Sequence, residues 1–366
     1  MRLIRLSGSG FRNLEPFDVA LDSQFVVWCG PNAHGKTNAL EAVHWLTTLK
    51  PLRGTRPRDM IRWGGEQATV TGHVEADGGV RQYRVELGVS RRLLVDERPI
   101  ADIGEYFEGL RCIAFQPSDA EIVSGEPARR RAWLDRAAFT AAPAHLGVAR
   151  GYKRILEHKS ALLRSRDIDA VQLDTLDDQL VRVGEELSRR RRAVLDELAP
   201  HAMQIHRSIA GEQASLELAY RSTTDLAERV ARARPEELRR RQALVGPQTD
   251  ELQITLDGQP ARTFASRGQT RSVVLALKLA EMVAAQARGD LPLFLIDDVS
   301  SELDRERTGR VVGLLTDLGA QVLATTTDPG HLGALPVDAT TWMTVDHGAV
   351  RPTASERWPG GPRRDN

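Results

Sequence analysis

The segment 30–37, GPNAHGKT, constrains this chain more than any other feature of its sequence. It matches the spacing G-x-x-x-x-G-K-[ST] at every fixed position, follows an apolar run at 25–28 and precedes apolar residues at helical spacing. This context predicts a strand, a loop whose backbone N–H groups turn onto phosphate oxygens, and a helix. Lys36 is expected to contact the β- and γ-phosphates of a nucleotide, and the Thr37 hydroxyl to bind Mg²⁺. The predicted phosphate-binding residues are Gly30, Pro31, Asn32, Ala33, His34, Gly35, Lys36, Thr37 and Asn38.

A second apolar run, 291–296, is followed by two carboxylates, Asp297 and Asp298. The run predicts a buried strand, and ligands of open α/β sheets bind at the carboxyl ends of such strands. Asp297 suits coordination of Mg²⁺ through water, and Asp298 suits positioning or deprotonating an attacking water. The alternative is a pair of solvated carboxylates at a strand end.

The segment from Ser266 to Gln269 has the spacing of a capping box, in which Ser and Gln satisfy two N–H groups at the start of a helix. That structural interpretation is complete by itself. A functional one coexists with it, because a helix start with Ser266 and an unobstructed Gly268 can dock on a phosphate.

Between about residues 142 and 245 the strand patterns give way to charged, helical sequence. Leucines and valines recur every three or four residues from Leu173 to Leu187, and Val194 and Leu198 continue the register, which predicts a long helix with a heptad seam. A helix before it, joined near 166–169, is expected to pack antiparallel to it, and Pro200 is expected to end or kink the second helix. The pattern favours an inserted coiled-coil arm over an ordinary helical bundle.

The chain has 50 Lys+Arg and 50 Asp+Glu, which excludes a uniformly basic nucleic-acid binder. One local segment, 50–63, has five basic residues against one acidic residue and could bind duplex phosphates. Its arginines are Arg53, Arg56, Arg58 and Arg62. The alternative is a solvated loop, and the run 189–192 is interpreted as a solvated helix face.

The two cysteines, Cys29 and Cys112, lie in apolar runs, which favours buried thiols in a reducing compartment. The first residues lack the pattern of a signal peptide, and no run approaches the length of a membrane span. A soluble, cytoplasmic protein without a membrane partner is expected.

Four elements follow one another in an order that resembles the ABC-type ATPase head. They are the loop at 30–37, Gln116 after a strand, S-x-G-Q at 266–269, and the double Asp at 297–298 followed by 301–304, SELD. Within that superfamily the chain resembles the RecF family over nearly its full length. The further motifs that carry this resemblance are RNL at 12–14, GPNxxGKTNxLE at 30–41, the segment 115–135 with RRR at 129–131, GPxxD at 246–250, SxGQxR at 266–271 and DDxxSELD at 297–304. The chain departs from the family pattern at 248–249, Gln-Thr, and at 50–53, KPLR.

The resemblance implies that Gln116 contributes to Mg²⁺ binding. It also implies that Gln116, Asp298 and Lys36 take part in catalysis. It also implies that Ser266, Gly268 and Gln269 of one copy close over a triphosphate held by another, with Ser301 and Asp304 in the D-loop. ATP would then join a homodimer, and slow hydrolysis would release it. The resemblance further implies binding of duplex, single-stranded or gapped DNA, and RecR and RecO as partners.

The expected organisation is an ATPase head at 1–141 and 246–350, a helical arm at 142–245 and a flexible tail at 351–366. The fold class is α/β, an ABC-type ATPase head with an inserted α-helical arm subdomain. The main alternative function is that of a P-loop ATPase or kinase unrelated to DNA. A transporter ATPase is a third possible function. It would need a docking site for a membrane partner, and the long heptad arm is not the insertion expected for that.

Overall fold

The computed structural model describes residues 1–53, 56–76, 78–100, 103–211, 215–299, 305–332 and 335–353. The chain forms two compact units, one of residues 1–118 and 281–366 and the other of residues 119–280. These units differ from the boundaries at 142 and 245 that the sequence suggests, because helix α4 (Pro127–Ala141) packs against both the long helix α6 (Ala170–Ala210) and strand β10 (Glu251–Leu256). In the described ranges, no helix has both the length and the apolar content needed to cross a bilayer.

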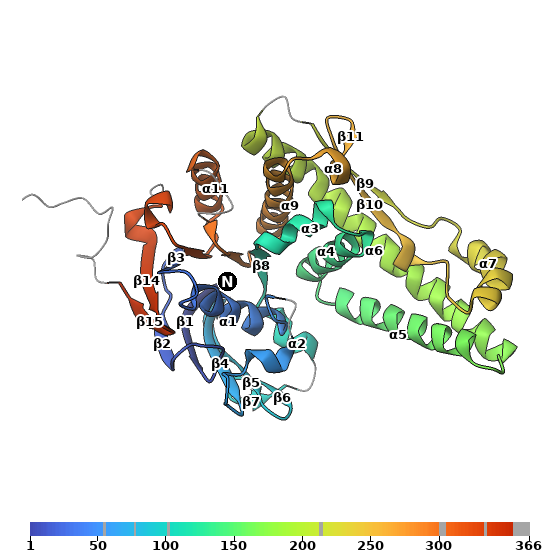
Figure 1. Ribbon diagram of the computed structural model, residues 1–366, viewed down its shortest axis with the longest axis horizontal. Coiled ribbons are helices and arrows are strands. Elements are labelled where there is room, and N and C mark those ends of the chain that lie inside the picture. Colours follow the sequence, from blue (N-terminus) through green and yellow to red (C-terminus); the bar gives the residue numbers. More distant parts are fainter. Residues whose placement is uncertain are drawn as a thin grey trace, which may run out of the picture. The chain divides into compact units, whose positions relative to one another are not determined.

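The first unit is built on a mostly parallel sheet (Figure 1). Its strands, in spatial order, are β15 (Ala349–Pro352), β14 (Thr340–Asp346), β3 (Phe25–Cys29), β13 (Val322–Thr326), β12 (Leu293–Ile296) and β8 (Cys112–Phe115). Only β15 runs antiparallel to its neighbour. Strands β3, β12 and β13 have every residue buried, as expected for a parallel sheet covered on both faces. The strands predicted at 25–28 and 291–296 are thereby confirmed within two residues.

An antiparallel sheet completes the first unit. Its strands, in spatial order, are β2 (Phe17–Ala20), β1 (Arg2–Ser9), β4 (Ala68–Ala76), β5 (Gly79–Leu87), β6 (Arg91–Val95) and β7 (Arg98–Pro99). The helices of this unit are α1 (Lys36–Thr48), η1 (Pro57–Met60), α2 (Ile103–Glu108), α11 (Arg305–Asp317), η4 (Pro329–Leu332) and η5 (Val337–Ala339). Strands β4 and β5 form a hairpin in which Ala76 pairs with Gly79, whereas Asp77 lies outside the described residues.

The second unit is mainly helical, with one small sheet of β11 (Gln259–Pro260), β10 (Glu251–Leu256) and β9 (Leu216–Arg221). Its helices are α3 (Glu121–Ser124), α4 (Pro127–Ala141), α5 (His145–Arg164), α6 (Ala170–Ala210), α7 (Leu226–Arg240), η3 (Pro247–Thr249) and α8 (Ala261–Phe264). Helix α9 (Arg267–Ala287) contains the boundary between the two units, and η2 (Pro117–Ala120) contains the other boundary.

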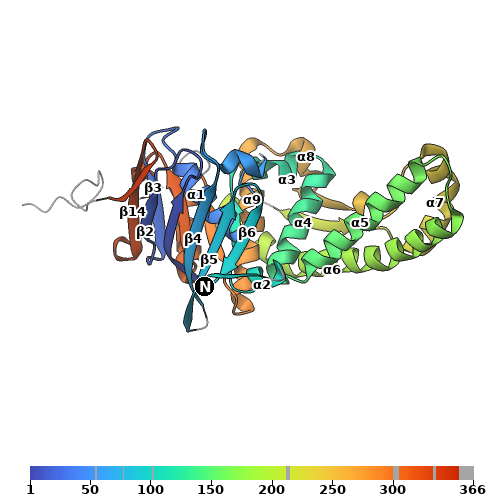
Figure 2. The ribbon, with the colours of Figure 1, turned by 90° about the horizontal axis from the view of Figure 1, so that it is seen from below.

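Helices α5 and α6 lie side by side, as the heptad pattern predicts (Figure 2). Asp169 begins α6, because its carboxylate accepts hydrogen bonds from the N–H groups of Val171 and Gln172. The seam residues Leu180 and Leu187 pack against α7 as well as α5. A buried Lys159 ties the three helices together, with its Nζ 2.7 Å from Asp177 and 2.6 Å from Glu237.

Pro200 does not end the helix, one of the two outcomes expected for it. Helix α6 continues to Ala210, because apolar residues beyond the proline, among them Ile205 and Ile209, are buried. The run 189–192 is also not simply a solvated face, since Arg191 is 5% exposed and pairs with Asp135.

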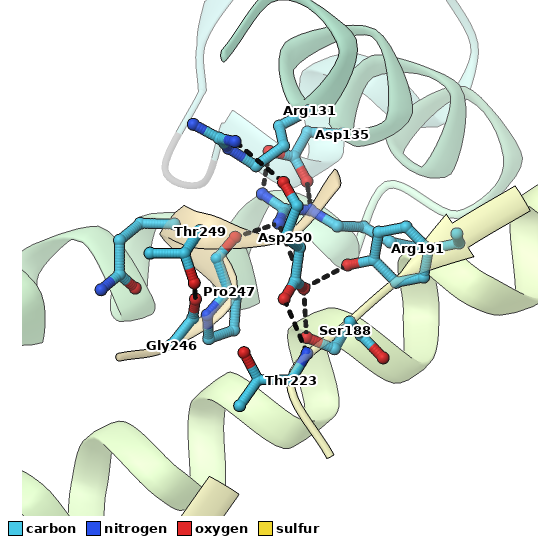
Figure 3. A network of polar contacts seen from close by, with 12 residues as sticks. Arg131, Asp135, Ser188, Arg191, Thr223, Gly246, Pro247, Thr249 and Asp250 are labelled. Carbon is cyan, nitrogen blue, oxygen red and sulfur yellow. Dashed lines mark hydrogen bonds and ion pairs between the residues drawn. The ribbon is translucent and has the colours of Figure 1, made fainter. Parts of the chain in front are cut away.

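Arg191 is the centre of a polar network that joins α4, α6 and the turn before β10 (Figure 3). Its Nε and one terminal nitrogen each donate to the Asp135 carboxylate at 2.8 Å, and the other donates to the Pro247 carbonyl at 2.9 Å. Asp250 is also buried, and its carboxylate accepts from the Ser188 hydroxyl at 2.8 Å and the Thr223 N–H at 3.0 Å. The GPxxD motif therefore fixes the beginning of β10 to the long helix.

Burial alone would raise the pKa of Asp135, but hydrogen bonds from Arg191 and His145 and their charges lower it to about 2. A carboxyl whose folded pKa lies below its ordinary value of 3.8 stabilises the fold above about pH 4. This contribution is lost as the pH falls through the folded pKa, near 2.

We predict that Asp135→Asn lowers the free energy of unfolding at pH 6, because Arg191 loses its anionic partner. The difference from wild type narrows by about 2 kcal/mol between about pH 5 and 2, since the wild-type carboxyl is then protonated. Urea titrations across this range measure it, with the exposed Asp196→Asn on the same helix as the matched control. A variant whose pH dependence equals that of wild type would contradict the assignment.

Candidate functional site: a phosphate loop with a buried carboxylate

The loop between β3 and α1 has the backbone that a phosphate cradle requires. Ala33 and Gly35 adopt left-handed φ angles of 66° and 116°, and α1 begins directly afterwards with no side-chain cap on its first N–H groups. These groups and the helix dipole favour an anion at this end of the helix. Gly30 has no room for a side chain, because a Cβ there would lie 2.2 Å from the Val345 carbonyl oxygen.

Lys36 is the first residue of α1 and lies folded back over the loop. Its side chain is part-buried, and its Nζ donates to the Pro31 carbonyl at 2.9 Å. Burial lowers the pKa of Lys36, while the negative charges of Asp298 and Asp297 act in the opposite direction. The loop therefore holds a part-buried ammonium group in the field of two carboxylates.

Thr37 and Asp297 meet although 260 residues separate them in the chain. The Thr37 hydroxyl donates to Asp297 Oδ1 at 2.9 Å, and the Thr325 hydroxyl donates to the same oxygen at 2.8 Å. The sheet order explains this contact, because β13 lies between β3 and β12 and the strands end at one edge. Burial raises the pKa of Asp297, although both hydroxyl hydrogen bonds lower it.

Asp298 and Gln116 lie beside this cluster in the sheet. The Asp298 N–H donates to the Thr325 hydroxyl at 2.7 Å, and Asp298 has a left-handed φ of 54°. Gln116 directly follows Phe115, which pairs with Ile296 and whose carbonyl accepts from the Asp297 N–H at 3.0 Å. The strand ends therefore bring Gln116, Thr37 and the two aspartates to the same edge of the sheet.

Sequence reasoning missed Thr325 as a member of this cluster. The signal was present, since Thr325 follows the apolar run 322–324 directly, as Asp297 follows the run 291–296. It also missed the local role of Asn13, whose side chain accepts from Asn38 at 2.7 Å and donates weakly to the His34 carbonyl at 3.4 Å.

Arg12 connects α1 to the basic segment. It pairs with the buried Glu41 through two nitrogens, at 2.8 and 3.0 Å, and donates to the Asp59 carbonyl at 2.8 Å. The segment itself is exposed at Arg53, Arg56, Arg58 and Arg62. Trp63 next to it is fully exposed, so the surface offers cations and one aromatic ring to solvent.

In the second unit, the capping box at the start of α9 is confirmed. The Ser266 N–H donates to Gln269 Oε1 at 2.8 Å, and the Gln269 N–H donates to the Ser266 hydroxyl at 3.2 Å. Gly268 follows within the first turn of α9. Ser301 and Asp304, assigned to the D-loop from the resemblance, lie outside the described residues.

The arginines of the RRR motif serve the second unit itself. Arg130 is buried and forms two hydrogen bonds with the Glu251 carboxylate, at 2.7 and 3.2 Å. Arg131 donates to the Asp250 carbonyl at 2.8 Å. Both therefore attach α4 to the first residues of β10.

Comparison with known proteins places these features in a class. The family model described as RecF/RecN/SMC N-terminal domain matches residues 2–348. A solved Smc head bound to the C-terminal winged-helix domain of ScpA has a TM-score of 0.60 with 14% identity, covering 96% of this chain and 97% of that one. The fold is that of an ABC-type, SMC-like ATPase head with a helical insertion.

Within that class the chain belongs to the RecF family of DNA replication and repair proteins. It is 40% identical to the RecF of Myxococcus xanthus, covering 96% of this chain and 97% of the relative. It is 34% identical to the RecF of Geobacter sulfurreducens, covering 96% and 100%. A solved structure of the recombination mediator protein RecF with ATP has a TM-score of 0.86 at 24% identity, covering 96% of this chain and 97% of that one.

We predict that Thr325→Val lowers the free energy of unfolding by about 1–3 kcal/mol, because buried Asp297 loses a donor and the Asp298 N–H loses an acceptor. Thr325→Ser keeps the hydroxyl and serves as the matched control. Urea unfolding at neutral pH measures both variants, and a Thr325→Val protein as stable as Thr325→Ser would contradict the role of the hydroxyl.

Proposed function

We propose that this chain is an ATP-dependent DNA-binding protein of recombinational repair and replication maintenance, active as an ATP-joined homodimer. The observation that carries the ATP part is the hydrogen bond between Thr37 and Asp297 directly beside the phosphate loop. A hydroxyl and a carboxylate are oxygen donors that suit Mg²⁺ held between the protein and a nucleotide. Membership of the RecF family supports the DNA part.

The residues present fit both ATP and Mg²⁺. Thr37 and Asp297 would hold the metal, with Gln116 beside them, and Mg²⁺ bound there would neutralise phosphate charge. The loop residues from Gly30 to Asn38 would bind the phosphates through backbone N–H groups, and Lys36 would move its ammonium from the Pro31 carbonyl to the β- and γ-phosphates.

Asp298 is the residue proposed to position or deprotonate the attacking water. Its backbone is fixed by the hydrogen bond to Thr325, which leaves the side chain at the carboxyl edge of the sheet. Hydrolysis is proposed to be slow and to release the dimer, so the nucleotide stabilises assembly because it binds the dimer better than the monomer.

The signature residues Ser266, Gly268 and Gln269 are proposed to act on the nucleotide of the other copy, with Ser301 and Asp304 in the adjoining D-loop. The two hydrogen bonds between Ser266 and Gln269 fix the position of the Ser266 hydroxyl at the start of α9. This arrangement fits docking on a phosphate, because the beginning of a helix attracts anions.

RecR and RecO are proposed as partners and the cytoplasm as the compartment, both from family membership alone. The division into head segments 1–141 and 246–350 with an arm at 142–245 stays a proposal about function. The two compact units follow packing and need not coincide with it.

We predict that Ser266→Arg leaves ATP binding intact and prevents ATP-dependent dimerisation, because a long cation replaces the hydroxyl that would meet the partner's nucleotide. Nucleotide titration and light scattering with ATP and Mg²⁺ measure the two properties. Lys36→Met is the companion variant, and it should lose binding and dimerisation together. Ser266→Ala tests the hydroxyl without added bulk.

A wild-type mass that does not change with ATP would contradict the dimer and favour the alternative of an ordinary P-loop enzyme. Dimerisation of Ser266→Arg at the wild-type ATP concentration would contradict the role of the signature in the partner's site.

For DNA, we predict that the double variant Arg58→Gln and Arg62→Gln binds duplex DNA more weakly at every sequence. The slope of log K against log salt falls by about one per lost phosphate contact. Fluorescence anisotropy with ATP and Mg²⁺ at several salt concentrations measures the slope. The control is Arg92→Gln with Arg98→Gln, two exposed arginines on β6 and β7. Equal slopes for the two double variants would remove the segment 50–63 as the DNA surface.

A further inference from the structure

Two imidazoles and one carboxylate converge beside the phosphate loop and take no part in the cluster at Thr37. His34 lies in the loop, whereas Asp346 and His347 lie at the end of β14. His34 Nδ1 is 2.8 Å from Asp346 Oδ1, and His347 Nε2 is 3.9 Å from the same oxygen. The two imidazole rings are 4.2 Å apart between centroids. One ligand atom from each residue lies within 4.8 Å of the other two.

The fold holds these side chains on a short, rigid turn. Asp346 pairs with Ala349 across the hairpin of β14 and β15, which leaves a two-residue loop of His347 and Gly348. Their φ angles, 46° and 90°, are both positive, as a tight hairpin turn of this length requires. The turn lies close to the backbone of Asn13, since a Cβ on Gly348 would lie only 2.1 Å from the Asn13 carbonyl oxygen.

The turn is also attached to the phosphate loop through the backbone. The Gly348 N–H donates to the His34 carbonyl at 2.9 Å, so the imidazole of His34 leaves a loop that is already fixed to the hairpin. The three groups therefore meet because of backbone geometry.

The distances fit a small tetrahedral ion. With metal–nitrogen and metal–oxygen bonds of about 2.0–2.2 Å, two ligand atoms of a tetrahedral site lie about 3.3–3.5 Å apart. The separations of 2.8 and 3.9 Å lie on either side of this value. In the described part of the chain, both ion-pair partners of Asp346 are histidines, so the carboxylate faces nitrogen ligands and not a lysine or arginine.

We propose that His34, Asp346 and His347 form a site for a divalent first-row transition metal, with Zn²⁺ the ion of choice. Two imidazole nitrogens with one carboxylate suit zinc and its neighbours, whereas Mg²⁺ and Ca²⁺ prefer oxygen ligands throughout. Three protein ligands leave one position for water. None of its residues belongs to the Mg²⁺ site proposed at Thr37 and Asp297. A metal ion bound here would act as a clip, a cross-link between the phosphate loop and the hairpin.

The test is a metal titration of the full chain without an affinity tag and without nucleotide. Zn²⁺ is titrated by calorimetry, and Co²⁺ serves as a spectroscopic probe of four-coordinate geometry. We expect one ion per chain in wild type. His347→Asn and Asp346→Asn should each weaken binding at least about tenfold, since changes outside the ligand set already cost about 10–100-fold. The control is His158→Ala, which removes an exposed imidazole on α5 and should bind as wild type does.

A second measurement reports on the clip itself. Zn²⁺ should slow hydrogen exchange of the amides at 33–36 and 347–348 in wild type but not in His347→Asn. Both substituted side chains are exposed, so the melting temperatures of the metal-free variants should match wild type and exclude unfolding as the cause.

Three results would overturn the proposal. They are no bound ion in wild type, equal affinity in the three site and control variants, or a Co²⁺ spectrum of octahedral type. The first two would leave His34 and Asp346 as a hydrogen-bonded pair without a metal, and the third would exclude a four-coordinate site. Because no nucleotide is present, failure here is distinct from failure of the ATP-joined dimer, which light scattering tests separately.

Discussion

The hydrogen bond from Thr37 to Asp297 depends on the whole first unit, because no local structure can bring together residues that lie 260 positions apart. It requires β3, β13 and β12 to lie next to one another and in parallel, so that their carboxyl ends meet at one edge. Apolar burial of these strands stabilises the sheet, and the polar residues stand where the strands leave the core. Chemistry at this edge is therefore a consequence of strand order.

The second unit distributes its charges differently. Arg191, Asp250 and Lys159 are buried, and each is surrounded by opposite charges or hydrogen-bond partners. A buried charge that lost its partner would be costly, so these networks favour one arrangement of helices over others. The arginines at 130 and 131 belong to this scaffold. The exposed arginines near Trp63 do not belong to this scaffold, and they are the ones proposed to contact DNA.

A single motif can serve more than one purpose in this chain. The capping box at Ser266 completes the start of α9 and also leaves that start suited to an anion. His34 belongs to the phosphate loop through its backbone and to the hairpin turn through its side chain. In both cases local hydrogen bonds hold a side chain in place for a proposed ligand. That ligand is a nucleotide phosphate for Ser266 and a metal ion for His34.

Local spacing and apolar periodicity were enough to predict the phosphate loop, the strands that flank it, the helical pair and the capping box. The sequence also assigned Thr37 and Asp297 to one metal ion, and their side chains are in hydrogen-bond contact. Three features follow from tertiary packing and not from local sequence: Thr325 joins this cluster, Arg191 is buried and α6 continues past Pro200. Strand order and helix packing depend on the burial of apolar surface from segments that are distant in the sequence. A local sequence pattern does not specify which of these segments will come into contact.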